Sequence, residues 1–324
     1  MFENNKVLVT GGTGFVGVNL LRRLLEIKDV NITATLHEKA PVLVDDRIKY
    51  IRCNLCKMED CHKVVQNIDY VFMCAAETAG AAIMEKMPIV HLAPNILMNI
   101  SMLQAAYEAR VKKFLFISSS IVYPVTDFPV QEDDVTNEFY EKYFIDGWMK
   151  RFTEIACEMY ATKIKDPMKI VVVRPANLYG EYDNFNLETS HVIPALIRKV
   201  VERHNPIEVW GDGNDLKEFL HIQDFVNGML LAMKKLDWFE PINIATGKSY
   251  TIREVLQIIL NVDRYRDAQI VFNTSKPTMI SKRLMDTTKA KLQLEFEAKI
   301  SLEEGIRRTV EWYRHMKNLP IPAV

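Results

Sequence analysis

The chain of 324 residues lacks any long apolar segment. Its apolar runs stay far below the ~18 residues that cross a bilayer as a helix. The opening residues, Met1 to Asn5, do not form a basic segment followed by an apolar one. The sequence therefore predicts neither a membrane span nor a signal peptide, and we expect a cytoplasmic protein. No internal repeat or low-complexity segment is visible.

An excess of charge of one sign is also missing. The chain has 41 basic and 42 acidic residues and a net charge of −1, so nucleic acid is not an expected partner. Hydrophobic residues make up 48% and charged residues 26% of the sequence, a balance typical of a folded chain with a sizeable core. The length allows one large domain or two modest ones.

Cysteine is scarce, and its five positions are scattered along the chain. An odd number at these spacings does not predict a disulfide framework. Cys53 and Cys56, with Cys61 and His62 close by, have a spacing seen in metal sites. A structural zinc site usually takes a second pair of ligands from a distant segment, and the sequence offers none. We therefore predict no metal and interpret the cysteines as small apolar residues in reducing surroundings.

The chain opens with a strand, a glycine turn and a helix, from Lys6 to Leu25. Residues 7–9 are a short apolar run, as in a buried parallel strand. Gly11 permits a tight turn, Gly14 lets the backbone approach a pyrophosphate, and Gly17 allows close packing of helix on strand. The helix N-terminus then offers free N–H groups to phosphates. An ordinary glycine-rich turn is the alternative. The residues assigned to this turn are Gly11, Thr13, Gly14, Phe15, Val16 and Gly17.

Strands and helices alternate after this turn, which predicts an α/β fold with a Rossmann-type, doubly wound parallel sheet. Expected strands cover residues 30–36, 48–55, 70–74, 114–118 and 169–173; expected helices cover 59–66, 93–109 and a segment that contains Lys150 and runs to 164. Ligands of such sheets bind beyond the carboxyl ends of the strands. The further residues expected to contact the cofactor are His37, Asn54, Leu55, Ala75, Ala76, Lys150, Pro175, Asn177 and Leu178.

The end of the second strand bears on the choice of cofactor. An NAD site would place an acidic residue there for the ribose 2′-hydroxyl. The strand instead ends at Leu36, and His37 and Lys39 are placed to face a 2′-phosphate, although Glu38 lies between them. The sequence therefore predicts NAD or NADP.

Loops lengthen after Pro175, and the pattern changes. We expect residues 1–175 to form the NAD(P)-binding domain and 176–324 a smaller, mostly helical substrate lobe, with interleaved lobes and an approximate boundary. Expected helices of the lobe cover residues 191–204, 223–236, 252–260 and 301–316.

The order of these motifs resembles the extended short-chain dehydrogenase/reductase family of NAD-dependent nucleotide-sugar epimerases and dehydratases. The resemblance covers nearly the whole chain and includes GGTGFVG, the serine strand 118–124 and the RPANLYG segment 174–180. Within the family, further segments are most similar to the GDP-L-fucose synthase branch. These segments are 75–80, 183–185, 190–196, 209–213 and 218–221.

The resemblance implies a site made of a serine, a tyrosine and a lysine, in which tyrosine moves a proton while hydride passes to or from nicotinamide. Ser119 and Lys150 match two of these positions. Four residues before Lys150 the family has tyrosine, but this chain has Asp146. A carboxyl beside a lysine is expected to have a low pKa and to serve as a cap or ion-pair partner. Tyr143 is two helical turns from Lys150 and is interpreted chiefly as a packing aromatic.

The resemblance also implies an epimerase pair of cysteine and histidine. His191 matches the histidine, but Ile121 stands at the cysteine position and cannot move a proton. His191 is left with three open roles: an acid, a donor to substrate, or a residue at a helix start. The residues expected to bind substrate are Ser119, Ser120, Asn177, His191, Val192, Trp210, Lys217 and Arg283, the last two through a diphosphate.

These features predict an NAD(P)-dependent epimerase/reductase-type oxidoreductase acting on a nucleotide sugar, with a GDP-linked one favoured. The alternative is a catalytically weak homologue that binds cofactor or nucleotide sugar as a regulatory or scaffold subunit. The family also implies a homodimer through the helices 93–109 and 150–164. Apolar positions available for that contact are Met98, Met102, Tyr107, Phe152, Ile155 and Met159.

Overall fold

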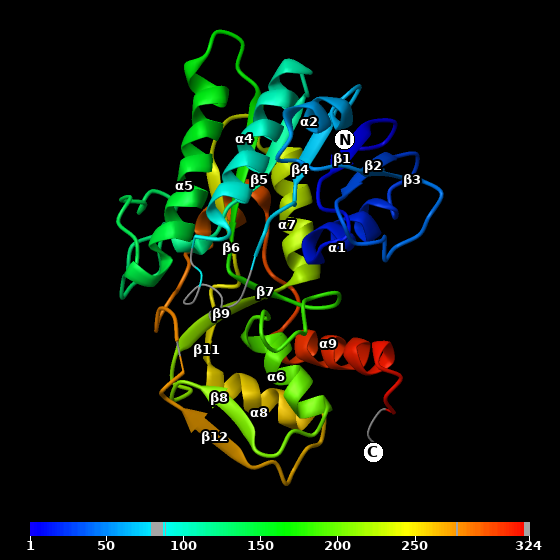
Figure 1. Cartoon of the computed structure of the whole chain (residues 1–324). Coiled ribbons are helices and arrows are strands. Elements are labelled where there is room, and N and C mark those ends of the chain that lie inside the picture. Colours follow the sequence, from blue (N-terminus) through cyan, green and yellow to red (C-terminus); the bar gives the residue numbers. More distant parts are fainter. Residues whose placement is uncertain (79–86, 88, 277, 321–324) are drawn as a thin grey trace.

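The computed structural model describes residues 1–78, 87, 89–276 and 278–320. The last two residues of the motif segment 75–80 lie outside this described part. Figure 1 shows an upper lobe built on a large sheet and a smaller lower lobe that ends in the C-terminal helix.

A seven-stranded parallel sheet forms the upper lobe, in the order β10-β6-β5-β4-β1-β2-β3. The strand order reverses between β1 and β4, which is the switch point where ligands of such sheets bind. This topology confirms the predicted Rossmann-type fold. The strands are β1 Lys6–Val9, β2 Asn31–Leu36, β3 Ile48–Arg52, β4 Tyr70–Met73, β5 Lys113–Ile117, β6 Lys169–Pro175 and β10 Pro241–Ile244.

Helices cover both faces of this sheet. One face carries α1 (Phe15–Leu24) and α7 (Ile222–Lys235), and the other carries α2 (Met58–Val64), α4 (Leu92–Glu108) and α5 (Phe144–Glu158). Side chains alternate along each strand, so Val7 and Val9 pack toward α1 while Leu8 packs toward α4. This two-sided burial explains why the strands read as continuous apolar runs rather than alternating ones.

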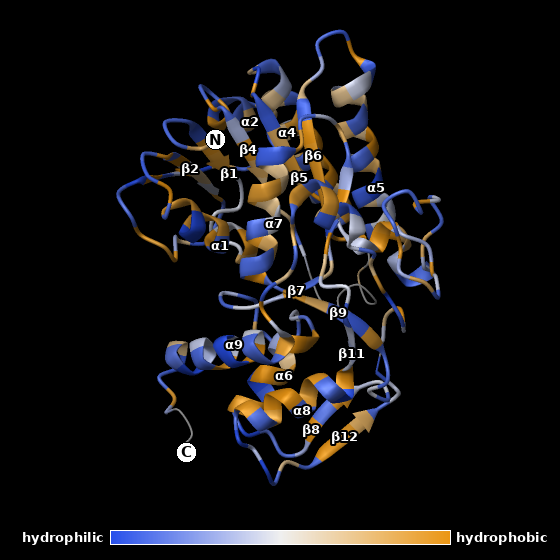
Figure 2. Ribbon diagram, turned by 180° about the vertical axis from the view of Figure 1, so that it is seen from behind, coloured by the Kyte–Doolittle hydropathy of each residue, from blue (hydrophilic) through white to orange (hydrophobic). Residues whose placement is uncertain are grey.

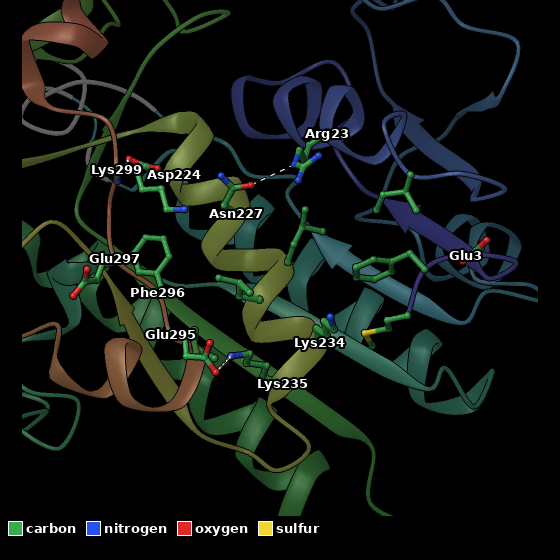
Figure 3. Close-up of a pocket in the computed structure, with 16 residues that line it drawn as sticks. Glu3, Arg23, Asp224, Asn227, Lys234, Lys235, Glu295, Phe296, Glu297 and Lys299 are labelled. Atoms are coloured by element: carbon green, nitrogen blue, oxygen red, sulfur yellow. Dashed lines mark hydrogen bonds and ion pairs between the residues drawn. The ribbon is translucent and has the colours of Figure 1, made fainter.

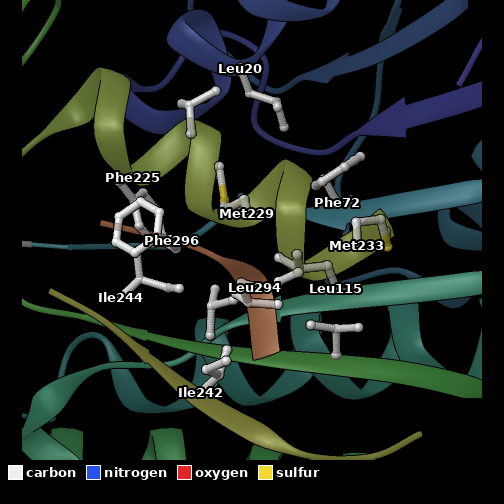
Figure 4. Close-up of a cluster of buried hydrophobic side chains, with 14 of the residues drawn as sticks. Leu20, Phe72, Leu115, Phe225, Met229, Met233, Ile242, Ile244, Leu294 and Phe296 are labelled. Atoms are coloured by element: carbon white, nitrogen blue, oxygen red, sulfur yellow. The ribbon is translucent and has the colours of Figure 1, made fainter. Parts of the chain in front are cut away.

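The two lobes interleave along the chain. The expected lobe helix 223–236 is α7, and it packs on the upper sheet through Phe225, Met229 and Met233 (Figure 4). Strand β10 follows and pairs with β6, placing Ile242 beside Val173. The chain therefore returns to the large sheet after residue 175. The apolar face of α7 is buried there against the apolar surface of the sheet.

The lower lobe contains α6 (Val192–Val201), α8 (Ile252–Val262) and α9 (Leu302–Met316) around a core of its own. It also has two small sheets, β11-β9-β7 and β12-β8, which the expectation of a mostly helical lobe omitted. Figure 2 shows α9 as mostly hydrophilic and β6 of the large sheet as hydrophobic. The strands of the two small sheets are β7 Asn177–Tyr179, β8 Ile207–Trp210, β9 Leu216–His221, β11 Ser249–Thr251 and β12 Ile270–Asn273.

Within the described residues, no helix has both the length and the apolar character needed to cross a membrane. The cytoplasmic location stays a prediction.

Candidate active site

The glycine turn connects β1 to α1 and has the geometry that a dinucleotide requires. Gly11 has a φ of 64°, and its N–H donates to Thr35 Oγ1 at 3.0 Å. A Cβ on Gly17 would lie 2.2 Å from the carbonyl oxygen of Gly11, so only glycine fits there. Gly14 caps the N-terminus of α1, and a Cβ on it would meet only the Gly11 oxygen, at 3.3 Å. The space that this Cβ would fill, at a helix N-terminus, fits a pyrophosphate.

The ends of the neighbouring strands gather around this turn. Thr10 Oγ1 accepts hydrogen bonds from the N–H groups of Cys74 and Ala75, both at 3.0 Å, and thereby holds the end of β4 against the turn. A Cβ on Gly11 would lie 2.8 Å from Ala75 Cα, which shows how close the two backbones run. Ala76 follows Ala75 in this same segment.

Two more strand ends carry predicted cofactor residues. Asn54 and Leu55 follow β3, where Asn54 Oδ1 accepts a hydrogen bond from the N–H of Cys56 at 3.0 Å. His37 follows β2, and its carbonyl oxygen accepts a hydrogen bond from Arg52. The sequence analysis missed Arg52, which adds a cation beside His37 at the position that decides between NAD and NADP.

Ser119 and Lys150 come together at the carboxyl edge of the sheet. Lys150 Nζ donates to the carbonyl oxygen of Ile117, the last residue of β5, at 2.9 Å. Ser119 lies two residues further on, and its hydroxyl accepts a hydrogen bond from the N–H of Ile121 at 3.3 Å. Burial lowers the pKa of Lys150 to about 8, although the neighbouring Asp146 carboxyl opposes this shift. Lys150 therefore lies at the end of β5 and gives up its proton more readily than an exposed lysine.

Asp146 lies one helical turn before Lys150 on α5, and its pKa differs from the expectation. Burial raises the pKa of the Asp146 carboxyl, and the charges of His91 and Lys150 offset this only in part. The predicted low pKa is therefore wrong, because the desolvation cost outweighs the neighbouring lysine. Asp146 is also not the cap of α5, since Tyr143 holds that position. Its carboxylate makes no direct ion pair with Lys150 in the described part of the chain.

Tyr143 ends a short 3₁₀ turn, Glu141–Tyr143, that leads into α5. Its ring packs edge-on against Tyr140, with the centroids 5.9 Å apart. Burial raises the pKa of the Tyr143 phenol, and the positive charge of Arg283 works in the other direction. A phenol with a raised pKa holds its proton at neutral pH, which suits the packing role better than that of a base.

The predicted residues of the lower lobe lie along its strands and at the start of α6. His191 caps the N-terminus of α6, just before Val192, and burial lowers the pKa of its imidazole. Asn177 Nδ2 donates to the carbonyl oxygen of Glu218 at 2.9 Å, which ties β7 to β9. Leu178 is the next residue of β7, and Pro175 ends β6. Trp210 ends β8.

The two cations predicted to bind a diphosphate already contact the protein itself. Arg283 is 5% exposed and donates to the carbonyl oxygens of Pro124 at 2.7 Å and Tyr123 at 3.1 Å. Lys217 donates to the carbonyl oxygen of Ile280, and its pKa is lowered by burial. Arg283 therefore anchors the loop that follows Ser119 and Ser120, and the phosphate roles stay predictions.

Arg174, the first residue of the RPANLYG segment, belongs to a buried hydrogen-bond network near the loop that contains Ser119. Arg174 forms two hydrogen bonds of 2.8 Å with the carboxylate of Glu154 and one of 3.0 Å with Tyr123 Oη. Tyr123 Oη donates in turn to Asn243 Oδ1 at 2.6 Å. Tyr123 is fully buried, so it supports the serine loop and does not face substrate.

Two titratable residues near these elements escaped the sequence analysis. His91 immediately precedes α4, and its Nε2 is buried with no hydrogen-bond partner in the described part of the chain. Asp183 has an equally unpartnered Oδ2, and burial raises its pKa to about 7. Asp183 lay in a segment already noted for its resemblance. His91 lies at the start of α4, the helix that packs beside α5.

A shallow groove of about 700 Å³ lies elsewhere, along α7. Figure 3 shows charged side chains of both signs on its walls, including Arg23, Lys235 and Glu295, with Lys235 paired to Glu295. None of the residues predicted for cofactor, substrate or catalysis lines this groove. The candidate site is therefore the carboxyl edge of the sheet and not this groove.

The fold and the glycine turn at this edge define an enzyme of the Rossmann type that binds a dinucleotide. The chain belongs to the NAD-dependent epimerase/dehydratase family, whose model matches residues 7–245. NAD or NADP is accordingly its cofactor, and its glycine turn fits that group.

Individual relatives match nearly the full length. The chain is 30% identical to GDP-L-fucose synthase of Escherichia coli, covering 96% of this chain and 97% of that protein. It is 29% identical to putative GDP-L-fucose synthase 2 of Arabidopsis thaliana, covering 96% and 92%. Among solved structures, UDP-glucose 4-epimerase of Thermotoga maritima with UDP-glucose has a TM-score of 0.86 at 27% identity, covering 96% and 99%. The chain is thus an enzyme of a nucleotide-sugar epimerase and reductase family.

Proposed function

We propose that the protein oxidises or reduces a ring carbon of a GDP-linked sugar, with Asp146 in the position of the family's tyrosine. The GDP assignment is supported by the relatives named as GDP-L-fucose synthases and by the segments that resemble that branch. Residues 1–175 would hold mainly the cofactor, and 176–324 the sugar nucleotide.

The observation that carries the proposal is the grouping of Ser119, Asp146 and Lys150 at the carboxyl edge of the sheet. NAD(P), when bound, exchanges a hydride with the sugar carbon. Ser119 would hold the reacting oxygen, and the Asp146 carboxylate would take the proton of the sugar hydroxyl. Lys150 would stabilise the charge on Asp146 and hold the cofactor ribose. His191 would contact the sugar from the lower lobe.

The test begins with mass spectrometry of any nucleotide released when the pure protein is denatured. Binding of GDP- and UDP-linked hexoses is then measured by calorimetry, and turnover is followed by NMR of the sugar. Tighter binding of GDP sugars with sugar conversion supports the proposal. Preference for UDP sugars overturns the GDP assignment. UDP sugars are included because the structural neighbour from Thermotoga maritima was solved with UDP-glucose.

Two departures from the family favour the alternative, a weakly active homologue that binds without turnover. These are Asp146 at the tyrosine position and Ile121 at the cysteine position. Binding of cofactor and sugar nucleotide without conversion of any sugar supports this alternative. Retention of Ser119 and Lys150 in the sequence favours catalysis.

We also propose a homodimer through α4 and α5. Leu97 of α4 is 51% exposed, Phe152 in the middle of α5 is 46% exposed, and Met159, which directly follows α5, is 52% exposed. Met102, one of the residues expected at this contact, is instead fully buried in the chain's own core. A contact between copies would cover the exposed apolar side chains, as in a symmetric four-helix interface.

A further inference from the structure

Glu218 is a buried residue of β9 whose carboxyl group holds two segments that are distant in the sequence. It is 1% exposed. Its Oε1 accepts hydrogen bonds from the N–H groups of Thr246 and Gly247, both at 2.6 Å, and its Oε2 accepts one from the N–H of Met285 at 3.1 Å. Both oxygens act as acceptors. The side chain is therefore a clamp between β9 and these two segments, made of three hydrogen bonds to the backbone.

The segment that contains Met285 also holds the loop that begins at Ser119. Arg283 lies two residues before Met285, and its guanidinium donates to the carbonyl oxygen of Pro124 at 2.7 Å. Pro124 ends the serine segment 118–124. The carboxyl group of Glu218 thus fixes the segment 283–285, and this segment in turn fixes the serine loop.

The main chain of Glu218 holds a second predicted site residue. Its carbonyl oxygen accepts a hydrogen bond from Asn177 Nδ2 at 2.9 Å, and Asn177 lies opposite Phe219 where β7 runs beside β9. The turn at residues 246–247 leads from β10 of the upper sheet to β11, which pairs with β9. Figure 1 shows β7 and β9 at the junction of the two lobes. Glu218 therefore contacts segments that enter this junction from both lobes.

We propose that Glu218 is a positioning residue, which holds Asn177 and the serine loop in a fixed relation to each other. The role rests on the proposed function, in which Ser119 holds the reacting oxygen and the lower lobe binds the sugar nucleotide. Glu218 is buried and does not face substrate, so it acts through Asn177 and Arg283. Alignment of this kind matters because a misplacement of ~1 Å can cost ~10²-fold in rate.

The experiment measures hydrogen exchange by mass spectrometry in the free, full-length protein. In Glu218→Gln, the amide oxygen can serve the turn at 246–247, where it makes two bonds, and the NH₂ group then faces the N–H of Met285. The segment 283–285 loses its acceptor, and the loop that Arg283 holds becomes looser. Exchange at residues 121–123 should be roughly 5- to 10-fold faster than in the wild type, the effect of about one lost hydrogen bond.

The matched control is Asp224→Asn. Asp224 is 3% exposed, and its Oδ2 accepts hydrogen bonds from the N–H groups of Lys299 at 3.0 Å and Ile300 at 2.8 Å. This carboxyl group is thus a clamp of the same kind, but it lies at the groove along α7, away from the predicted site residues. Asp224→Asn should speed exchange at residues 299–300 and leave exchange at 121–123 unchanged.

Kinetics separate positioning from a purely structural role. Glu218→Gln should lower kcat/KM for the sugar nucleotide by about 10²-fold relative to Asp224→Asn. Binding of NAD(P)H should stay unchanged, because Thr10 and Thr35 hold the glycine turn and the strand end beside it. A purely structural role lowers the Tm of both variants and does not separate their kcat/KM values.

A second variant keeps the test decisive if Glu218→Gln does not fold. Glu218→Asp keeps the carboxyl group but shortens the side chain by one CH₂, so it cannot hold both segments at once, and it should also speed exchange at residues 121–123. Unchanged exchange there in whichever of the two variants folds overturns the role of Glu218. The exchange measurement needs neither cofactor nor substrate. Faster exchange in a protein that converts no sugar nucleotide therefore supports the contact with the serine loop and counts against the proposed function alone.

Discussion

Replacing Asp146 by Asn tests whether this carboxyl is the proton acceptor of the site. Asn has nearly the same shape but cannot take a proton, so Asp146→Asn should lose the contribution of a general base. Such a loss is typically about 10²- to 10⁴-fold in kcat, or ~3–5 kcal/mol of transition-state stabilisation. The matched control is Glu158→Gln, a partly exposed carboxyl at the end of the same helix, which should retain full activity.

The same substitution should have the opposite effect on stability. Burial raises the pKa of Asp146 in the folded protein, so the stability associated with its protonated form is present at low pH and is lost as pH rises through the folded pKa. Asn does not titrate and avoids this loss, so Asp146→Asn should have an equal or higher Tm at pH 7.5. Full activity in Asp146→Asn with the wild-type Tm would refute the reasoning, and Tyr143 would become the next candidate.

Three further outcomes follow from other parts of the structure. Gly14→Val should abolish binding of NAD(P)H, measured by fluorescence, at an unchanged Tm, because its side chain would occupy the open cradle; normal binding would displace the cofactor from this turn. Glu154→Gln should destabilise the fold by about 3–5 kcal/mol in urea unfolding, because it leaves Arg174 buried with a weakened partner; a loss below ~1 kcal/mol would show that solvent reaches this pair. Phe152→Lys should convert a sedimenting dimer to a monomer, whereas Leu292→Lys, at a 76% exposed site on another element, should not; a monomeric wild type would discard the interface.

The features predicted best from sequence are those that local patterns determine. The turn at Gly11 and Gly17 follows from spacing alone, since a strand, a tight turn and a helix meet there. The packing of α7 on the upper sheet was not predicted, because it depends on elements that are distant in the sequence. The spacing of apolar residues in α7 predicts a helix. It does not predict that Phe225 and Met229 cover the upper sheet, because that contact depends on how β10 and its neighbouring strands are arranged.

Prediction of the site failed where several elements combine to set one property. Lys150 lies one helical turn after Asp146 on the same helix, which by itself predicts a low pKa. Burial acts more strongly, and it comes from the fold as a whole. His91 lies 55 positions before Asp146 in the sequence, and the parallel packing of α4 and α5 places both residues near the N-terminal ends of neighbouring helices. The Ser119 and Lys150 positions, by contrast, came from motifs, and the structure places them at one edge of the sheet.

The chemical identity of the proton-handling group affects which direction of reaction the site favours. A tyrosine with a pKa near ~10 is protonated at neutral pH and readily gives its proton to a carbonyl oxygen that is being reduced. A carboxyl, with an ordinary pKa near ~4, is deprotonated over more of the pH range than a phenol, so it is more often free to accept a proton, although the carboxylate is the weaker base. Burial also lowers the pKa of Lys150 to about 8, so the pKa values of the two groups move toward each other. If Asp146 accepts the proton, the first step is oxidation of a sugar hydroxyl. The proton stored on Asp146 then serves the return step, which suits a cycle that ends in epimerisation better than one that ends in net reduction.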